Sequence, residues 1–170
     1  MNRRELVRTL ALGAAAATMP ISTIRSAPAP LPPPNVHTPD LDEAVRSHVW
    51  ACWIGHATVL MFIGGKWILT DPVLFDAYGV NVLGVTIGPR RLIRPALSID
   101  EIPRPDLILL SHAHLDHMDR TTLIEMSERY QGQIDVITAT RTMDVISDLP
   151  WKSLNEMDWG ETASVHGIEL

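Results

Sequence analysis

The sequence predicts an α/β (α+β) domain in which strands come first and strands alternate with helices later. Segments rich in β-branched and aromatic residues flank a Gly64-Gly65 pair, which is a strong signal for a β-hairpin. Two later apolar runs are each followed by a segment with the apolar spacing of a helix. One of these strand-to-helix junctions carries a dense group of histidines. This order suits one layer pair of an αββα sandwich.

Residues 1–29 are interpreted as an export signal of the twin-arginine type. Arg3 and Arg4 precede an uncharged, Ala-rich stretch at residues 10–19, and this stretch is shorter than a membrane span. Residues 27–29 have the small-x-small pattern of a cleavage site, but the next residue is a proline that should hinder cutting. We therefore expect an exported, periplasmic protein that stays anchored at the membrane if the signal is uncleaved. An amphipathic cytosolic start is the alternative.

A proline-rich linker is predicted at residues 30–47, with a short helix near residues 41–45. The globular domain is predicted to span residues 48–170. Its first strands are expected at residues 49–54, 59–63 and 66–70. Residues 75–95 contain several glycines and prolines and predict a long loop, of the kind that forms lids or binds substrates.

The second half of the domain is predicted to alternate strands with helices. Strands are expected at residues 106–110 and 134–138, and helices at residues 119–126 and 141–149. Asp116 and Asp119 are both suitable capping residues for the first of these helices. Residues 164–170 are interpreted as a strand in which His166 is an ordinary strand residue.

The densest chemical signal is the motif SHAHLDH at residues 111–117. His112, His114, Asp116 and His117 put four potential metal ligands into six residues, and imidazole with carboxylate is the ligand set of zinc and of other divalent metals. Histidines in a solvated loop scatter and do not cluster at this spacing. His112 and His114 can reach one metal from a curved loop. The adjacent Asp116 and His117 point differently and suit a second metal.

With this H-x-H-x-D-H motif, the chain resembles the metallo-β-lactamase superfamily. Further segments occur in the order seen in the N-acyl-phosphatidylethanolamine phospholipase D-like branch, and the resemblance covers roughly residue 49 to the end. These segments are WIGHATVL (53–60), LTDP (69–72), GPRRL (88–92), IP (102–103) and EMDWGE (156–161). Leu115 departs from the branch, whose members often have tyrosine there. The resemblance implies a metallo-β-lactamase-type αββα sandwich, of which this chain supplies the N-terminal half.

The resemblance also implies roles for individual residues. Asp116 would orient the attacking water as well as ligate a metal. His56 would lie near the metal centre as a catalytic candidate, although a lone histidine is as often a structural hydrogen-bonding residue. Asp71 would fix the orientation of the ligands from behind, which we favour over a turn-capping role. The remaining ligands of the family lie downstream of the matched region, so we expect the 170-residue chain to bind metal weakly and to hydrolyse little.

The activity that the resemblance implies is hydrolysis by a metal-bound hydroxide. One or two zinc ions are expected, with iron or manganese as alternatives. The branch favours a phosphodiester in a small-molecule or phospholipid-like substrate, which is compatible with association with a membrane surface. An ester, amide or lactone is the alternative. The redox proteins of the superfamily typically have glutamate at the position of His114, which favours hydrolysis here.

Charge narrows the classes of partner. The net charge of −6 disfavours nucleic-acid binding, which usually needs a basic face. Arg90, Arg91, Arg94 and Arg104 fall in one segment and suit a phosphate pocket, or they are solvated loop charges. The oligomeric state does not follow from the sequence. Three hypotheses remain open: a metallohydrolase, a catalytically incomplete metal-binding or partner-binding fragment, and a small protein whose oligomer completes the site in trans.

Overall fold

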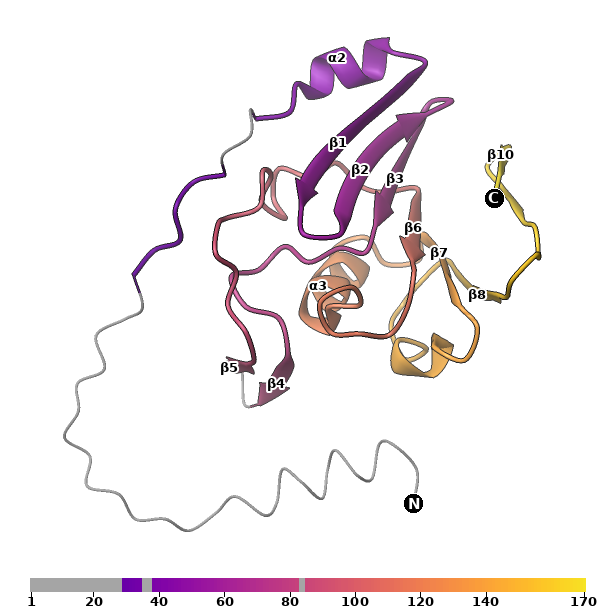
Figure 1. Ribbon diagram of the computed structural model, residues 1–170. Helices are drawn as coiled ribbons and strands as arrows, with labels where there is room; N and C mark the ends of the chain where they lie inside the picture. The colour runs from indigo at the N-terminus through magenta and orange to yellow at the C-terminus, as the bar shows by residue number, and fades with distance from the viewer. Residues whose placement is uncertain (1–28, 35–37, 83–84) are drawn as a thin grey trace, which may run out of the picture.

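The computed structural model describes residues 29–34, 38–82 and 85–170 (Figure 1). All but the last residue of the predicted export signal lies outside the described residues. Within the described part of the chain, no helix has the length and apolar character needed to cross a membrane.

A mixed six-stranded sheet forms the centre of the molecule, in the order β1-β2-β3-β6-β7-β8 (Figure 1). Its strands are β1 (Val49–Gly55), β2 (Thr58–Ile63), β3 (Lys66–Thr70), β6 (Leu107–Leu110), β7 (Asp135–Ala139) and β8 (Ser153–Met157). The first three strands pair antiparallel, and the pairs from β3 to β8 are parallel. The α/β prediction is therefore confirmed. The carboxyl ends of the parallel strands meet at one edge, where ligands of open α/β sheets usually bind.

The predicted hairpin between β2 and β3 is confirmed. Gly64 and Gly65 have φ angles of 57° and 80°, which a two-residue turn between twisted antiparallel strands requires. The β1–β2 turn at the other end of β2 consists of His56 and Ala57. It lies at the same edge of the sheet as the carboxyl end of β3, because β1 and β3 both run antiparallel to β2.

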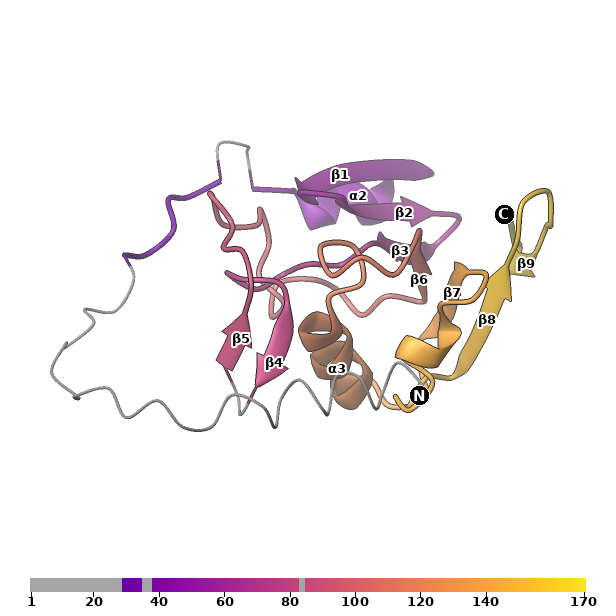
Figure 2. The ribbon, with the colours of Figure 1, turned by 60° about the horizontal axis from the view of Figure 1, so that its bottom comes forward.

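Helix α3 (Arg120–Arg129) lies on one face of the sheet (Figure 2). It begins where expected, because the side chain of Asp119 accepts a hydrogen bond from the backbone N–H of Thr122. Leu123 and Met126 are buried against apolar side chains of the sheet, including Leu69. The core of the domain therefore lies between α3 and the sheet.

Helix α2 (Leu41–Arg46) confirms the helix expected near residues 41–45. Leu41 packs against the main core, and Ala44 is fully buried. The backbone N–H of Arg94 also donates to the carbonyl of Pro32. The boundary at residue 48 stays a prediction, but residues of the predicted linker contact the domain.

The opposite face of the sheet carries a smaller apolar cluster centred on Ile68, Leu107 and Ile137. The hairpin formed by β9 (Ser164–Val165) and β10 (Ile168–Glu169) packs side chains against it. This hairpin corrects the prediction of one continuous strand. His166 lies in its turn with a φ of 56° and is not a strand residue.

The helix predicted at residues 141–149 is wrong. The structure has only a 3₁₀ turn at Met143–Val145 there. The Glu156 carboxylate accepts hydrogen bonds from the backbone N–H groups of Thr142 and Met143, at 2.9 and 2.7 Å. Arg141 has a φ of 64°, which an α-helix excludes. These contacts from a later strand hold the backbone in a turn where the apolar spacing alone indicates a helix.

The segment predicted as a long loop, residues 75–95, contains a short hairpin of β4 (Val80–Val82) and β5 (Val85–Ile87). Strand β8 has no counterpart among the strands that the sequence predicts. Its residues are mixed in polarity and only partly buried, as is common for a strand at a sheet edge.

Candidate metal centre

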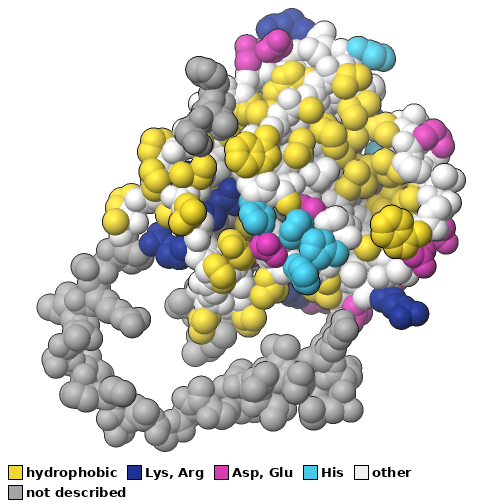
Figure 3. Space-filling view, viewed as in Figure 1, with side chains coloured by type: hydrophobic (Ala, Val, Ile, Leu, Met, Phe, Trp, Pro, Cys, Tyr) yellow, Lys and Arg dark blue, Asp and Glu magenta, His cyan; other side chains and the backbone are white. Residues whose placement is uncertain are grey.

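The motif at residues 111–117 forms the loop between β6 and α3. A tight turn closes it, in which the carbonyl of His114 accepts hydrogen bonds from the backbone N–H groups of His117 and Met118. The turn brings three imidazole rings together. The ring centroid of His112 lies 4.5 Å from that of His114 and 4.1 Å from that of His117. Figure 3 shows these side chains gathered around an acidic group near the middle of the visible face.

His56 reaches this group from the β1–β2 turn. Its φ of 55° and a hydrogen bond of 2.7 Å from Trp53 Nε1 to its carbonyl oxygen fix the turn. Its Nε2 lies 3.0 Å from Asp116 Oδ2. Within the described residues, His56, Asp116 and His117 offer ligand atoms that all lie within 4.8 Å of one another. The structure therefore brings His56 beside the pair that the sequence assigns to a second metal.

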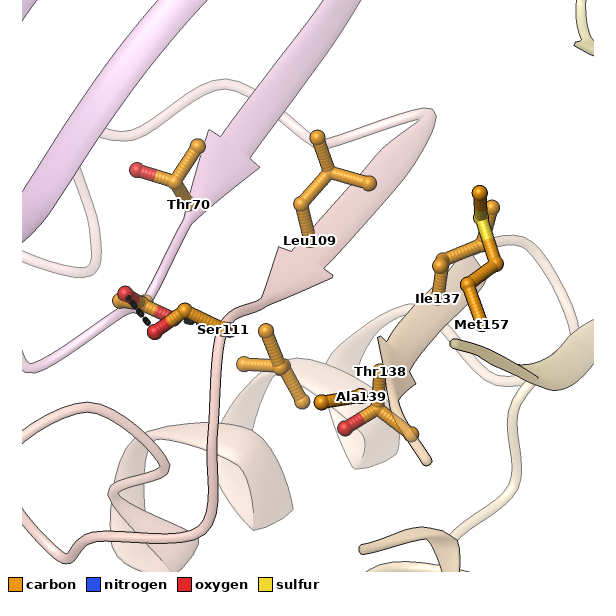
Figure 4. Close-up of a pocket in the computed structure, with 9 residues that line it drawn as sticks. Thr70, Leu109, Ser111, Ile137, Thr138, Ala139 and Met157 are labelled. Carbon is orange, nitrogen blue, oxygen red and sulfur yellow. Dashed lines mark hydrogen bonds between the residues drawn. The ribbon is translucent and has the colours of Figure 1, made fainter. Parts of the chain in front are cut away.

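Asp71 lies behind the motif, directly after β3. Its Oδ1 accepts a hydrogen bond of 2.8 Å from the backbone N–H of Ser111, and its Oδ2 accepts one of 2.7 Å from Ser111 Oγ. Figure 4 shows Ser111 at the end of β6 with this contact as a dashed line. The same Oδ2 lies 2.9 Å from His117 Nδ1. When His117 Nδ1–H donates to this carboxylate, Nε2 is left with its lone pair available to a metal.

Further contacts fix Asp71 itself. Thr58 Oγ1 donates to the carbonyl oxygen of Asp71 at 2.8 Å. The backbone N–H of Asp71 donates to the carbonyl of Leu109 at 3.0 Å. Asp71 has a φ of 37°, and only 9% of its side chain is exposed. The carboxylate is therefore held between β2, β3 and β6 before any ion binds.

Asp116 is well suited to remain ionised. Partial burial by itself would raise the pKa of its carboxyl group. The hydrogen bonds from His56 and from its own backbone, together with the charges of His117 and His56, outweigh this effect and lower the pKa below its ordinary value. About a third of the side chain, 34%, is exposed, so an ion and water can reach it.

The donor set fits a divalent metal. Asp116 Oδ2 lies between His56 Nε2 and His117 Nε2, at 3.0 and 3.9 Å, and the three groups are imidazole or carboxylate. His112 and His114 lie beside them. His166 does not join this group. Its Nε2 lies 2.8 Å from Asp135 Oδ2, at the opposite edge of the sheet.

Two residues of the site, Ser111 and Tyr78, have no role predicted from the sequence. Ser111 bridges Asp71 and His112, with its Oγ 2.9 Å from His112 Nδ1. The position of Ser111 at the start of the histidine motif is the sequence feature that could have indicated its role. Tyr78 stacks on His56, with ring centroids 5.8 Å apart. Nothing in the local sequence pattern connects Tyr78 with His56, because the two residues lie on separate segments.

Residues 66–170 match the family described as the Beta-lactamase superfamily domain. The chain belongs to this family. The match begins at β3 and includes Asp71 and the whole histidine motif. The β-lactamase superfamily assignment from the sequence is therefore confirmed.

Several proteins are similar to this chain over most of its length. An uncharacterized protein of Mycobacterium tuberculosis is 30% identical over 145 residues, which are 85% of this chain and 37% of that protein. The mitochondrial N-acyl-phosphatidylethanolamine-hydrolyzing phospholipase D of Saccharomyces cerevisiae is 35% identical over 126 residues, 73% of this chain and 25% of that protein. The N-acyl-phosphatidylethanolamine-hydrolyzing phospholipase D 1 of Caenorhabditis elegans is 28% identical over 138 residues, which are 78% of this chain and 37% of that protein. The chain thus spans 25–37% of the length of these relatives.

Solved structures support the fold. A possible metal-dependent hydrolase from Veillonella parvula is similar with a TM-score of 0.53 at 19% identity, over 72% of this chain and 47% of that one. CmlA, a diiron β-hydroxylase from Streptomyces venezuelae, is similar with a TM-score of 0.52 at 23% identity. The match covers 72% of this chain and 23% of that one. At these identities the similarity concerns the fold alone.

Proposed function

We propose that the protein containing this chain is a metal-dependent hydrolase that cleaves a phosphodiester in a phospholipid-like substrate. One observation carries the proposal: three imidazoles and the Asp116 carboxylate converge at the carboxyl edge of the sheet, supported from behind by Asp71. Two relatives named as N-acyl-phosphatidylethanolamine-hydrolyzing phospholipases D support the choice of substrate class.

The ligands would be His112, His114, Asp116 and His117. A zinc ion held by these residues would supply Lewis-acid catalysis and would lower the pKa of a water molecule to about 7. Zinc suits imidazole and carboxylate, and iron or manganese accepts the same ligands. Asp71 contributes by holding His117 in one ring orientation and by fixing the start of the loop through Ser111.

His56 and Asp116 would handle the proton of the attacking water. In the tautomer that carries its proton on Nε2, His56 donates to Asp116 Oδ2 across 3.0 Å, which fixes the orientation of the carboxylate toward an attacking water. This carboxylate stays ionised because its pKa is lowered. Tyr78, stacked on His56, keeps the imidazole from rotating away.

The test uses the protein translated from the whole reading frame that contains this chain. We expect elemental analysis to find a stoichiometric transition metal, and we expect turnover of bis(p-nitrophenyl) phosphate. Asp116→Asn should lower turnover by about 10²–10⁴-fold. Asp42→Asn, at an exposed position of α2, should not. A metal-free protein, or a metal-loaded protein that hydrolyses p-nitrophenyl esters but no phosphodiester, would overturn the proposal.

A further inference from the structure

Two hollows flank the His56–Asp116 pair, and their linings differ in chemistry. Resting on the proposed function, we propose that they divide an anionic amphiphile between them. The hollow at Arg90 and Arg91 takes the phosphate-bearing end of the ligand, and the hollow at Ile87 and Leu115 takes its hydrocarbon chain.

The cationic hollow has a volume of about 320 Å³. It is lined by Trp53, His56, Tyr78, Arg90, Arg91, Leu92 and Ile93. Arg91 is buried, and its guanidinium donates to the carbonyl oxygens of Val73 and Ile93 at 2.7 and 3.3 Å. A guanidinium fixed in this way presents its remaining N–H groups without further loss of side-chain entropy.

Burial distinguishes Arg91 from an ordinary solvated loop charge. It lowers the pKa of the Arg91 guanidinium, against the opposing charges of Tyr78 and Asp76. An anion bound beside Arg91 would stabilise the charged guanidinium and so offset the loss of solvation on burial. Arg90 is more exposed, and its Nη2 lies 3.7 Å from Asp76 Oδ2. Such a long contact at the surface is weak, so Arg90 can turn toward an anion in the hollow.

The apolar hollow has a volume of about 400 Å³. It is lined by Tyr78, Gly79, Ile87, Gly88, Pro89, Ala113, His114, Leu115 and Asp116. Ile87 and Leu115 expose 62% and 45% of their surface, although large apolar side chains gain free energy when they are buried. Two proposed metal ligands lie in the same lining. An apolar group that enters here is therefore brought next to the reacting centre.

The two hollows meet at Tyr78, which lines both. His56 lies in the lining of the first and Asp116 in that of the second, with Nε2 and Oδ2 3.0 Å apart. A ligand that occupies both hollows therefore passes over this pair. In Figure 3, basic side chains and hydrophobic side chains border the histidine cluster on the same face. Because the chain carries a net charge of −6, this local cationic site is what draws an anionic ligand.

The experiment compares methyl phosphate, octyl phosphate and octanol by calorimetry, with EDTA-treated and zinc-loaded protein. We expect octyl phosphate to bind about tenfold more tightly than methyl phosphate, because part of the chain is buried. Octanol should bind more weakly than octyl phosphate. Leu115→Asn and Ile87→Asn should each remove most of the chain-length effect and leave the affinity for methyl phosphate unchanged.

Arg90→Gln should lower the affinity for both phosphates about fivefold to tenfold. The matched control is Arg94→Gln, because Arg94 does not line either hollow. Circular dichroism of each variant establishes that the fold is intact. Equal affinities for methyl and octyl phosphate in the unaltered protein would overturn the apolar subsite. Equal affinities for octyl phosphate and octanol would overturn the cationic one. Because the chain-length effect should persist in EDTA, a failure of metal binding or hydrolysis is distinguishable from a failure of this inference.

Discussion

At the scale of single residues, Asp71 connects the sheet to the loop that carries the histidine motif. It binds Ser111 through two hydrogen bonds and contacts His117 Nδ1. We expect Asp71→Asn to weaken zinc binding by about 10–100-fold, because an amide accepts through one oxygen only and cannot hold both partners as the carboxylate does. Competition with a chromophoric chelator measures this affinity.

The control for Asp71→Asn is Asp100→Asn. Asp100 is largely exposed and pairs with Arg129, on a segment away from the motif, so its loss should leave zinc affinity unchanged. If both variants bind zinc as the unaltered protein does, Asp71 acts only as a turn-capping residue, which is the alternative role that the sequence allows.

Gly55 is the second residue whose identity the structure explains. Its φ is +134°, and a Cβ atom there would lie 2.5 Å from Arg91 Nη2. We expect Gly55→Ala to lower the free energy of unfolding by about 1–3 kcal/mol, as measured by urea denaturation. Gly65→Ala is the matched control, because its φ is also positive, +80°, but nothing lies within 4 Å of the added atom. Equal losses in the two variants would show that the contact with Arg91 does not matter.

Single residues are most predictable from the sequence where chemistry and spacing coincide. His112, His114, Asp116 and His117 are predicted as ligands because four metal-binding side chains within six residues seldom occur together in a solvated loop. For His56 the sequence allows two roles, because a lone histidine carries no spacing information. The structure places it beside Asp116. Tyr78 cannot be found in this way, since its contact with His56 depends on how two distant segments pack.

At the scale of elements, a buried aspartate connects β7 to its neighbours. Asp135 contacts Lys152 Nζ at 2.7 Å, Ser153 Oγ at 2.5 Å and His166 Nε2 at 2.8 Å. Burial alone would raise the pKa of Asp135, but the hydrogen bonds from Lys152 and Ser153 and the charges of Lys152 and His166 lower it below its ordinary value. The carboxylate thus joins β7, β8 and the β9–β10 hairpin.

The lowered pKa gives a prediction for Asp135→Asn. A carboxylate with a depressed folded-state pKa stabilises the fold above its unfolded-state pKa, about 3.9, and this contribution disappears as the pH falls through the folded-state value. We expect the variant to lose about 1–3 kcal/mol of unfolding free energy at pH 7. The difference should shrink below about pH 4. Urea denaturation across this pH range measures it, and exposed Asp42→Asn should show no such difference. A loss that does not depend on pH would contradict the argument.

Elements are predictable where burial and hydrogen bonding follow the local pattern. Strands β1, β2, β3, β6 and β7 are rich in apolar residues, and each has an expected counterpart. The helix expected at residues 141–149 does not form, because Glu156, on a strand that the sequence does not predict, binds the backbone N–H groups of Thr142 and Met143. Helical apolar spacing in this segment cannot reveal a long-range contact of that kind.

At the scale of the whole molecule, the sheet is covered unequally. α3 and the main core cover one face. The other face is covered in part by the β9–β10 hairpin, and a hollow of about 260 Å³ lies beside it, lined in part by Leu109, Ile137 and Met157 (Figure 4). The sequence indicates a layered α/β domain, but it does not show which face is covered, because that depends on where the short C-terminal hairpin packs.

The incompletely covered face leads to a prediction about self-association. Strand β1 is at the edge of the sheet, and Val49, Ala51 and Trp53 lie on this face, where Val49 is 65% and Trp53 48% exposed. An exposed apolar edge strand is a site for pairing with another chain. We expect the purified 170-residue chain to form concentration-dependent oligomers in light scattering coupled to size exclusion.

Ala51→Glu tests this prediction directly. A charge in the middle of β1 should shift the molecule toward a monomer, because pairing would bury it without a partner. Val45→Glu is the matched control, since Val45 is 53% exposed but lies on α2, outside the sheet. A monomer at every concentration of the unaltered chain would contradict the prediction, as would an equal shift in the two variants. An equal shift would show that the contacts between copies do not involve β1.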